Sequence, residues 1–335
     1  MQYKQHKDHH PFAAVMPTKN LAYYIYWTIS IVLAPLTFLT RFTIVIIGII
    51  LNSVSLSSLI KGQNMDLPLK PLRRRIIRFF QILSSKIIIF GFGFTITERN
   101  KHLKPKQTEN VLISNHVASS DPVVYASLGF TSFVSKEQVR QIPIYSTMAI
   151  AGQGLFVDRS ARDGSSLRKM IDRISDNSGN FPLLTVFPEG TTVNQASLIQ
   201  FKRGAFSAMK PVSMACIRYC QRFFNTSDAS QNKVILQLKT MIAIWNPVVI
   251  DYMGILAPLQ GETDVEFANR ARNQYIERYG FVACDCTWKD NYYFNSLANT
   301  QYEDTSDYYK AHFGPEVTRQ NKFVIFKKNL KLKNE

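Results

Sequence analysis

The most uneven part of the hydrophobic pattern lies near the start of the chain. From Leu21 to Ile60 the side chains are uncharged, with Arg41 as the one exception. Since an apolar helix of about 20 residues crosses a bilayer, this segment predicts a membrane anchor made of one long tilted span or two short ones, with Pro35 as its only strong breaker. An arginine at the centre of a span costs about 2.5–3.5 kcal/mol. Arg41 is therefore expected near an interface or facing protein.

A basic and apolar segment follows the anchor. Arginines alternate with isoleucines and phenylalanines from Lys70 to Leu83, a pattern typical of a helix that lies in the membrane interface. Basic residues beside a span also favour anionic lipid and the cytosolic side. We therefore expect a polar N-terminal arm (1–20), followed by a membrane anchor with a basic interfacial helix (21–90). The alternative to a membrane anchor is a pair of buried core helices. A cleavable signal peptide is not expected, because the apolar segment begins too late and runs too long.

Beyond residue 90, short apolar runs alternate with helical patterns. Runs rich in β-branched and aromatic residues predict strands at 92–97, 111–114, 131–135, 155–157, 183–187 and 212–219. Helical patterns lie between several of them, near 122–128, 137–151 and 167–175. Two further elements are expected, namely paired strands over 234–250 and a helix over 262–278. This alternation predicts an α/β fold, a mixed sheet covered by helices, in one domain (91–280) with a C-terminal extension and basic tail (281–335).

The net charge of +16 is concentrated in two segments. Eleven basic residues stand against two acidic ones between Lys61 and Lys106, and six against one between Arg319 and Glu335. The body of the chain is therefore close to neutral, which argues against nucleic acid as a partner, because such a domain interleaves basic and aromatic residues over its surface. The four cysteines lack Cys-x-x-Cys spacing and are expected to be packed thiols rather than a zinc site.

A histidine and an aspartate five positions apart are the candidates for chemistry. The block 115–121 reads Asn-His-Val-Ala-Ser-Ser-Asp, and His116 is the single histidine between residues 103 and 311. A base with an orienting acid, and no nucleophile beside them, suits a reaction in which the substrate supplies the attacking hydroxyl. The alternative is structural, because Asp121 followed by Pro122 is also a good helix start. A helix that starts there would still leave the preceding residues free to bring His116 back toward Asp121.

Three more blocks follow in a fixed order: Gly154–Arg159, Phe187–Thr192 and Lys210–Val212. Together with the Asn-His-x-x-x-x-Asp block, they resemble the four motifs of the glycerolipid acyltransferase superfamily. Any one of these motifs is weak alone, whereas four in order are specific. Further runs, such as 201–206 and 267–272, resemble the lysophosphatidylcholine/lysophosphatidylethanolamine acyltransferase branch.

Two positions depart from the pattern of this superfamily. Thr192 stands where lysophosphatidate acyltransferases usually carry arginine, which lowers the expectation of that acceptor. Met214-Ala215 replaces the second proline expected in the fourth block. The acceptor is therefore not fixed by the motifs.

The resemblance implies a glycerol-3-phosphate acyltransferase-like fold and a membrane-bound enzyme. The implied reaction moves a fatty acyl group from acyl-CoA, as co-substrate, to the free hydroxyl of a lysophospholipid, with lysophosphatidylcholine or lysophosphatidylethanolamine favoured. His116 would be the general base, oriented by Asp121. Glycerol-3-phosphate or lysophosphatidate acylation, CoA-independent transacylation and a non-catalytic lipid-binding scaffold are the alternatives. No cofactor and no metal is implied.

The resemblance also implies an acceptor site. Arg159 would hold the acceptor phosphate, an anion that a guanidinium grips through two hydrogen bonds. The rest of that site would be lined by Glu189, Gly190 and Thr191.

Charge and the C-terminus add two weaker expectations. Lys202 and Arg203 are candidates for CoA phosphates on charge alone. Lysines at positions 331 and 333 resemble a dilysine retrieval signal, which favours the endoplasmic-reticulum membrane with the catalytic domain facing the cytosol. The implied partners are then a phospholipid membrane, acyl-CoA and a lysophospholipid.

Overall fold

The computed structural model describes residues 11–12, 15–106, 109–158, 164–229, 232–288 and 290–291. Most of the expected N-terminal arm and C-terminal extension, including the two C-terminal lysines, therefore lies outside the described residues. Arg159 also lies outside them.

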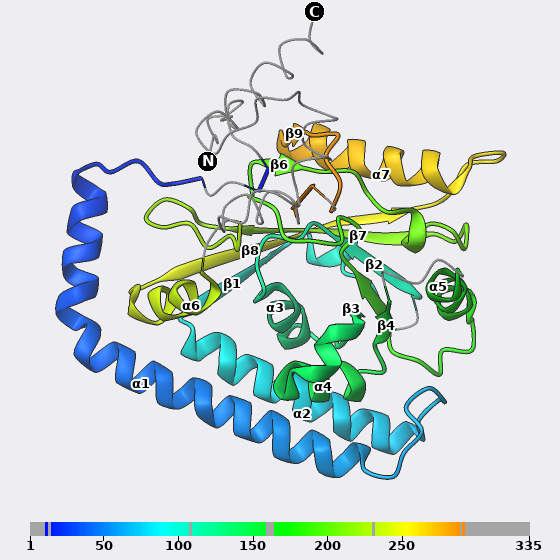
Figure 1. Cartoon of the computed structure of the whole chain (residues 1–335), viewed down its shortest axis with the longest axis horizontal. Helices are drawn as coiled ribbons and strands as arrows, with labels where there is room; N and C mark the ends of the chain where they lie inside the picture. Colours follow the sequence, from blue (N-terminus) through cyan, green and yellow to red (C-terminus); the bar gives the residue numbers. More distant parts are fainter. Residues whose placement is uncertain are drawn as a thin grey trace, which may run out of the picture.

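One helix, α1 (Leu21–Ile60), occupies the whole apolar segment and continues through Pro35. Figure 1 shows it passing α6 (Lys233–Ile242) and then running along α2 (Pro71–Gly91). It is long and apolar enough to cross a membrane, and only 22% of its most apolar stretch is buried. A core helix of a soluble domain buries most of its surface, so α1 is a candidate membrane anchor built as one helix rather than two.

Arg41 faces protein, which is one of the two placements predicted for it. Its guanidinium donates hydrogen bonds to the carbonyl oxygens of Met241 (3.1 Å), Ile244 (2.8 Å) and Ala243. These carbonyls lie at the C-terminal end of α6, where a helix leaves acceptors without intrahelical partners and where its dipole favours a cation. The arginine therefore joins the middle of α1 to the folded domain.

The interfacial helix expected after the anchor is α2. One of its faces packs against α1 and α3 (Asp121–Ser127). The other carries exposed large apolar side chains at helical spacing: Leu72, Ile76, Phe79, Leu83 and Phe90. Such an exposed apolar face is typical of contact with lipid.

The central sheet has the strand order β1-β8-β7-β2-β5-β3-β4. Neighbouring strands are parallel except for β7 and β8, which are antiparallel, so the predicted mixed sheet is confirmed. The strands are β1 (Phe94–Arg99), β2 (Val111–Ser114), β3 (Ser132–Lys136), β4 (Leu155–Val157), β5 (Leu184–Val186), β7 (Val212–Tyr219) and β8 (Asn246–Leu256). A separate two-stranded sheet pairs β6 (Ser197–Leu198) with β9 (Val282–Ala283).

Helices cover both faces of the central sheet (Figure 1). Because side chains alternate along a strand, Leu112 of β2 packs with residues of α2, α3 and α4, whereas Val111 and Ile113 pack with residues of α5 and α7. The remaining helices are α4 (Pro143–Ala151), α5 (Ser165–Ser175) and α7 (Asp264–Tyr279), with short 3-10 turns η1 (Lys101–Leu103), η2 (Glu137–Gln141) and η3 (Arg203–Ala205). The sheet core is thus closed on both sides.

Two sequence predictions of secondary structure are wrong. Paired strands were expected over 234–250, but α6 fills the first part and β8 begins only at Asn246. The side chain of Asn232 caps α6 by accepting from two amides. The helix expected over 137–151 is divided, because Pro143 has no amide hydrogen and disfavours helical geometry in the residue before it; η2 precedes it and α4 starts there.

Candidate active site

The block that begins at Asn115 leaves the end of β2 and enters α3. The side-chain amide of Asn115 donates to the carbonyl of Ile217 (3.0 Å), and its Oδ1 accepts from the amide of Ile217 (2.9 Å). This two-way contact ties the start of the block to β7. The asparagine of the motif therefore fixes where the following histidine lies.

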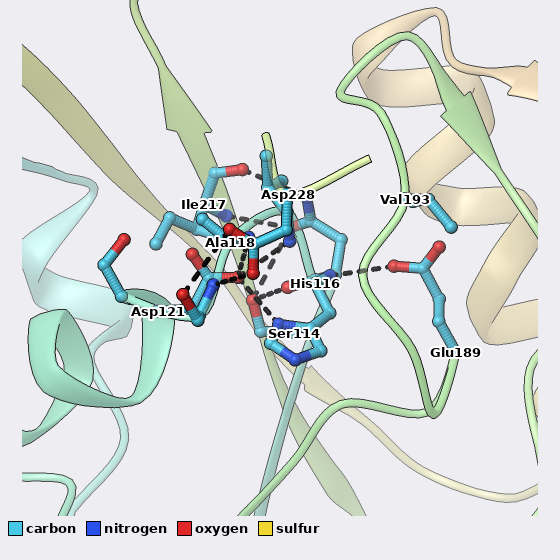
Figure 2. Close-up of polar contacts among 12 residues, drawn as sticks. Ser114, His116, Ala118, Asp121, Glu189, Val193, Ile217 and Asp228 are labelled. Carbon is cyan, nitrogen blue, oxygen red and sulfur yellow. Dashed lines mark hydrogen bonds and ion pairs between the residues drawn. The ribbon is translucent and has the colours of Figure 1, made fainter. Parts of the chain in front are cut away.

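The structure brings His116 and Asp121 together. Nδ1 of His116 lies 2.8 Å from Oδ2 of Asp121, across the loop that precedes α3 (Figure 2). Because an ionised carboxylate can only accept, Nδ1 carries the hydrogen and Nε2 is the basic nitrogen. The Asp121 side chain is fully buried, whereas 18% of the His116 side chain is exposed. The imidazole thus bridges a buried acid and an accessible space.

Asp121 is held by donors from its own loop and from β7. The amides of Val117 (2.7 Å) and Ala118 (3.0 Å) donate to Oδ2. The hydroxyl of Tyr219, the last residue of β7, donates to Oδ1 at 2.5 Å. A buried carboxylate is costly without such partners, and here they fix the direction from which it meets His116.

The third motif supports His116 from the other side. The imidazole stacks on Phe187, with ring centroids 4.2 Å apart and planes 16° from parallel. The amide of His116 donates to Oε1 of Glu189 (2.8 Å), and its carbonyl accepts from the amide of Val193 (3.0 Å). Ring and backbone are therefore both positioned by residues 187–193.

The structure differs from the prediction for Glu189. This residue was expected to line the acceptor site, but its side chain is fully buried and lies outside the wall of the cavity beside His116. Figure 2 shows its carboxyl group directed at the backbone of His116. Burial raises the pKa of Glu189 to about 8, against the opposing effect of the His116 amide. The next residue, Gly190, has φ of 70°, and this turn sends the glutamate inward while the chain continues along the cavity.

A cavity of about 480 Å³ opens beside His116. Its apolar wall comes from strands, α4 and α5: Phe133, Val134, Met148, Val157, Leu167 and Met170. Its charged wall contains Lys136, Asp158, Lys202, Asp228 and Lys233. A mixed lining of this kind suits a ligand that has both a hydrocarbon chain and a charged group.

Three more of the predicted site residues line this cavity, and one does not. Gly190, Thr191 and Lys202 are in its wall. A Cβ atom at Gly190 would lie 2.6 Å from Cε of Lys202, so the glycine allows the lysine to pass closely. Arg203 is outside the wall and lies 3.9 Å from Asp264. Arg159 is beyond the described residues.

Sequence reasoning missed another buried carboxylate at the site, Asp228, in the loop before α6. Its Oδ2 accepts from the amide of Ser119 (2.6 Å) and lies 3.8 Å from Nζ of Lys233. Burial raises the pKa of Asp228, while Lys233 lowers it. No motif marks this residue, which reaches the site only because the loop folds back over residues 117–119.

Comparisons with known proteins identify a family and several similar chains. Residues 95–217 match the family model described as Acyltransferase. A solved structure, the 1-acyl-sn-glycerophosphate (LPA) acyltransferase PlsC from Thermotoga maritima, overlaps with a TM-score of 0.49 and 16% identity, covering 78% of this chain and 94% of that chain.

Curated relatives carry more specific names. Lysophosphatidylcholine acyltransferase 2 of Mus musculus is 30% identical over 67% of this chain and 42% of its own length. Lysophosphatidylcholine acyltransferase 1 of Homo sapiens is 26% identical over 65% of this chain and 42% of its own length. Lysophospholipid acyltransferase LPEAT2 of Arabidopsis thaliana is 24% identical over 71% of this chain and 44% of its own length. The chain thus spans less than half the length of these relatives.

Three of the four motifs now have a structural explanation. The first supplies the His116–Asp121 pair, the third positions it, and the fourth begins the strand that ends in Tyr219. The family match covers the first and third motifs and ends two residues before Tyr219. The chain belongs to the glycerolipid acyltransferase family, in the branch that resembles the lysophosphatidylcholine acyltransferases.

Proposed function

We propose that the chain transfers a fatty acyl group from acyl-CoA to the free hydroxyl of a lysophospholipid, with lysophosphatidylcholine or lysophosphatidylethanolamine as the favoured acceptor. One observation carries this proposal: His116, paired with the buried Asp121, lines a cavity that is partly apolar and partly charged. The names of the curated relatives support the choice of acceptor.

In the proposed reaction, Nε2 of His116 removes the proton from the acceptor hydroxyl. The oxygen then bonds to the thioester carbon, the carbon–sulfur bond breaks, and the imidazolium returns the proton to the departing CoA thiolate. Asp121 keeps the imidazole in the required tautomer and stabilises its charged form. The protein needs no nucleophile of its own, because the substrate provides it.

We assign the predicted binding residues to the two substrates. Arg159 is proposed to bind the acceptor phosphate, as the family resemblance implies, and Gly190 and Thr191 are proposed to line the acceptor site. Lys202 is proposed to meet CoA phosphate, whereas the exposed Arg203 has Asp264 as its neighbour and is the weaker candidate. Glu189 is reassigned as a positioning residue, since it holds the backbone of His116.

The apolar helices suggest where the reaction takes place. The exposed apolar surfaces of α1 and α2 would keep the cavity at a bilayer surface, where both lipid substrates are found. The basic residues of α2 favour the cytosolic leaflet. We therefore propose a membrane enzyme whose catalytic domain faces the cytosol, with the endoplasmic reticulum as the expected compartment.

The decisive experiment is an acyl-transfer assay on the purified full chain with labelled acyl-CoA. One panel of acceptors would contain lysophosphatidylcholine, lysophosphatidylethanolamine, lysophosphatidate and glycerol 3-phosphate. His116→Ala should lower turnover by about 10³-fold or more, given that a general base and its associated groups act as a unit, and should leave vesicle flotation unchanged. His102→Ala is the matched control, since His102 is exposed, lies in η1 and does not line the cavity beside His116.

The alternatives give different results in the same assay. A lipid-binding scaffold would show no turnover with any acceptor. A CoA-independent transacylase would leave the labelled acyl-CoA unconsumed and release no free CoA, and it would acylate the acceptor only when a phospholipid acyl donor is added. Preference for glycerol 3-phosphate or lysophosphatidate would replace the favoured acceptor but keep the mechanism, and full activity of His116→Ala would reject the mechanism itself.

A further inference from the structure

A second cavity, of about 230 Å³, lies between α2, the residues just before it, and the loop that precedes β5. It shares no lining residue with the cavity beside His116. Its wall contains three arginines of α2: Arg74, Arg75 and Arg78. Apolar residues complete much of the wall: Leu69, Ile77, Phe181 and Pro182. The cavity therefore combines concentrated positive charge with an apolar surface.

The three guanidinium groups retain most of their hydrogen-bonding capacity. Arg74 donates to the carbonyl of Gly179 (2.9 Å), and Arg78 donates to the carbonyl of Gly129 (3.4 Å). In the part of the chain that the structure describes, none of the three forms an ion pair with a carboxylate. Since each guanidinium has five N–H donors, the cavity offers donors and charge for an external anion.

The surroundings indicate what kind of anion fits. Leu69, Ile77, Phe181 and Pro182 line the cavity beside the arginines, and α2 packs along α1, the candidate membrane helix. An anion bound by the arginines would therefore have apolar protein surface beside it. A free inorganic anion would make no use of that surface, whereas a lipid would place its chains against it.

We propose that this cavity binds the phosphate-bearing head group of an anionic glycerophospholipid. Arginine is suited to phosphate because its planar donors reach two oxygens at once. The apolar part of the lipid next to its head group would contact the apolar wall of the cavity. Binding here would fix the orientation of the domain on the bilayer, and it goes beyond the proposed reaction because it requires no turnover.

The test is a calorimetric titration of the purified full chain with dihexanoyl phosphatidate, at concentrations where this short-chain lipid is monomeric. The paired variant Arg74→Gln with Arg78→Gln should weaken binding about tenfold or more, since it removes two positive charges and their charge-assisted hydrogen bonds to the phosphate. Arg73→Gln is the matched control: it removes the same charge from the same helix but does not line the cavity, and binding should change less than twofold. A membrane version compares flotation with vesicles with and without phosphatidate.

Several outcomes would overturn the proposal. Phosphatidate bound in the cavity beside His116 instead would keep its affinity in the paired variant, so unchanged affinity counts against the arginine site. If Arg73→Gln weakens phosphatidate binding as much as the paired variant does, the binding comes from general charge attraction and not from a defined site. If inorganic phosphate binds as tightly as phosphatidate, an anionic lipid is rejected as the occupant. Equally tight binding of dihexanoyl phosphatidylcholine would reject it as well. If the paired variant unfolds, Arg74→Gln alone gives the same comparison. The hydrogen bond of Arg74 to Gly179 lies at an exposed loop, so its loss should not unfold the protein.

Discussion

Tyr219 donates its phenolic hydroxyl to Oδ1 of Asp121, while the other oxygen of that carboxylate meets His116. The two residues are 98 positions apart and meet because β7 lies beside β2, from which the His116 loop emerges. Tyr219 is itself fully buried with its ring against Phe94. Strand pairing thus places a donor behind the acid of the candidate catalytic pair.

Removing this donor should impair the chemical step more than substrate binding. In Tyr219→Phe the ring still fills its place, but Asp121 loses a charge-assisted bond worth about 1.5–3 kcal/mol. We expect kcat to fall about tenfold with KM within twofold, because the tyrosine does not line the cavity. Thermal unfolding serves as the control for folding. A change confined to KM would contradict a role in positioning Asp121.

Glu189 should make the stability of the protein depend on pH. Its pKa is raised from 4.5 to about 8 by burial, so between these values the folded state keeps a proton that the unfolded chain has released. Stability is therefore fully present below about pH 4.5 and is lost as pH rises toward 8. Glu189→Gln can still accept from the His116 amide and has no charge to bury.

Comparing Glu189→Gln with the parent chain separates the titration of Glu189 from that of other groups, including Asp228. The free energy of unfolding of Glu189→Gln, relative to the parent chain, should rise by a few kcal/mol between pH 5 and pH 8. Urea unfolding at several pH values measures it. A constant difference across that range would mean that Glu189 is ionised in the folded state.

The sequence predicted the parts of the site that are local. His116 lies in the loop that leads into α3, and the helix start at Asp121-Pro122 leaves residues 117–120 free to bring the two side chains together. Most strands were also predictable, because each is a short apolar run bounded by turns. Strand order was not predictable from these patterns, because periodicity shows that a strand is buried and does not identify its neighbour.

The parts that sequence reasoning missed come from distant segments. Tyr219 and Asp228 reach the His116 loop through strand pairing and a long connection, and no motif marks either residue. The α6 helix was mistaken for strands because its β-branched residues, Val234 and Ile235, are exposed at the surface rather than packed in a sheet. Exposed apolar residues there fit a protein that lies against a membrane, a context that overrides intrinsic propensity.

Arg41 should be required for attachment of α1 to the domain. Arg41→Met removes the hydrogen bonds to Met241, Ala243 and Ile244, and we expect a loss of about 2–4 kcal/mol, since bonds to charged groups are worth about 1.5–3 kcal/mol each. Arg41→Lys should restore less than half of this loss, because an ammonium cannot reproduce the planar fork. Thermal unfolding in detergent measures both. Equal stability of all three proteins would show that Arg41 has no structural role.

Gly190 should affect the site in two ways: through its backbone conformation, and because it has no side chain to displace Lys202. Its φ is 70°, a conformation that costs another residue about 1–2 kcal/mol, and a Cβ atom would also meet Cε of Lys202 at 2.6 Å. Gly190→Ala should therefore push Lys202 away from its present position, 4.3 Å from the ring centroid of Trp288.

Gly62→Ala separates the two effects, since Gly62 has φ of 69° and nothing within 4 Å of an added Cβ. Both variants should lose similar stability, but only Gly190→Ala should raise the KM for acyl-CoA, by about fivefold or more if one charged contact is lost. If Gly62→Ala raises that KM equally, strain rather than displacement of Lys202 explains the effect.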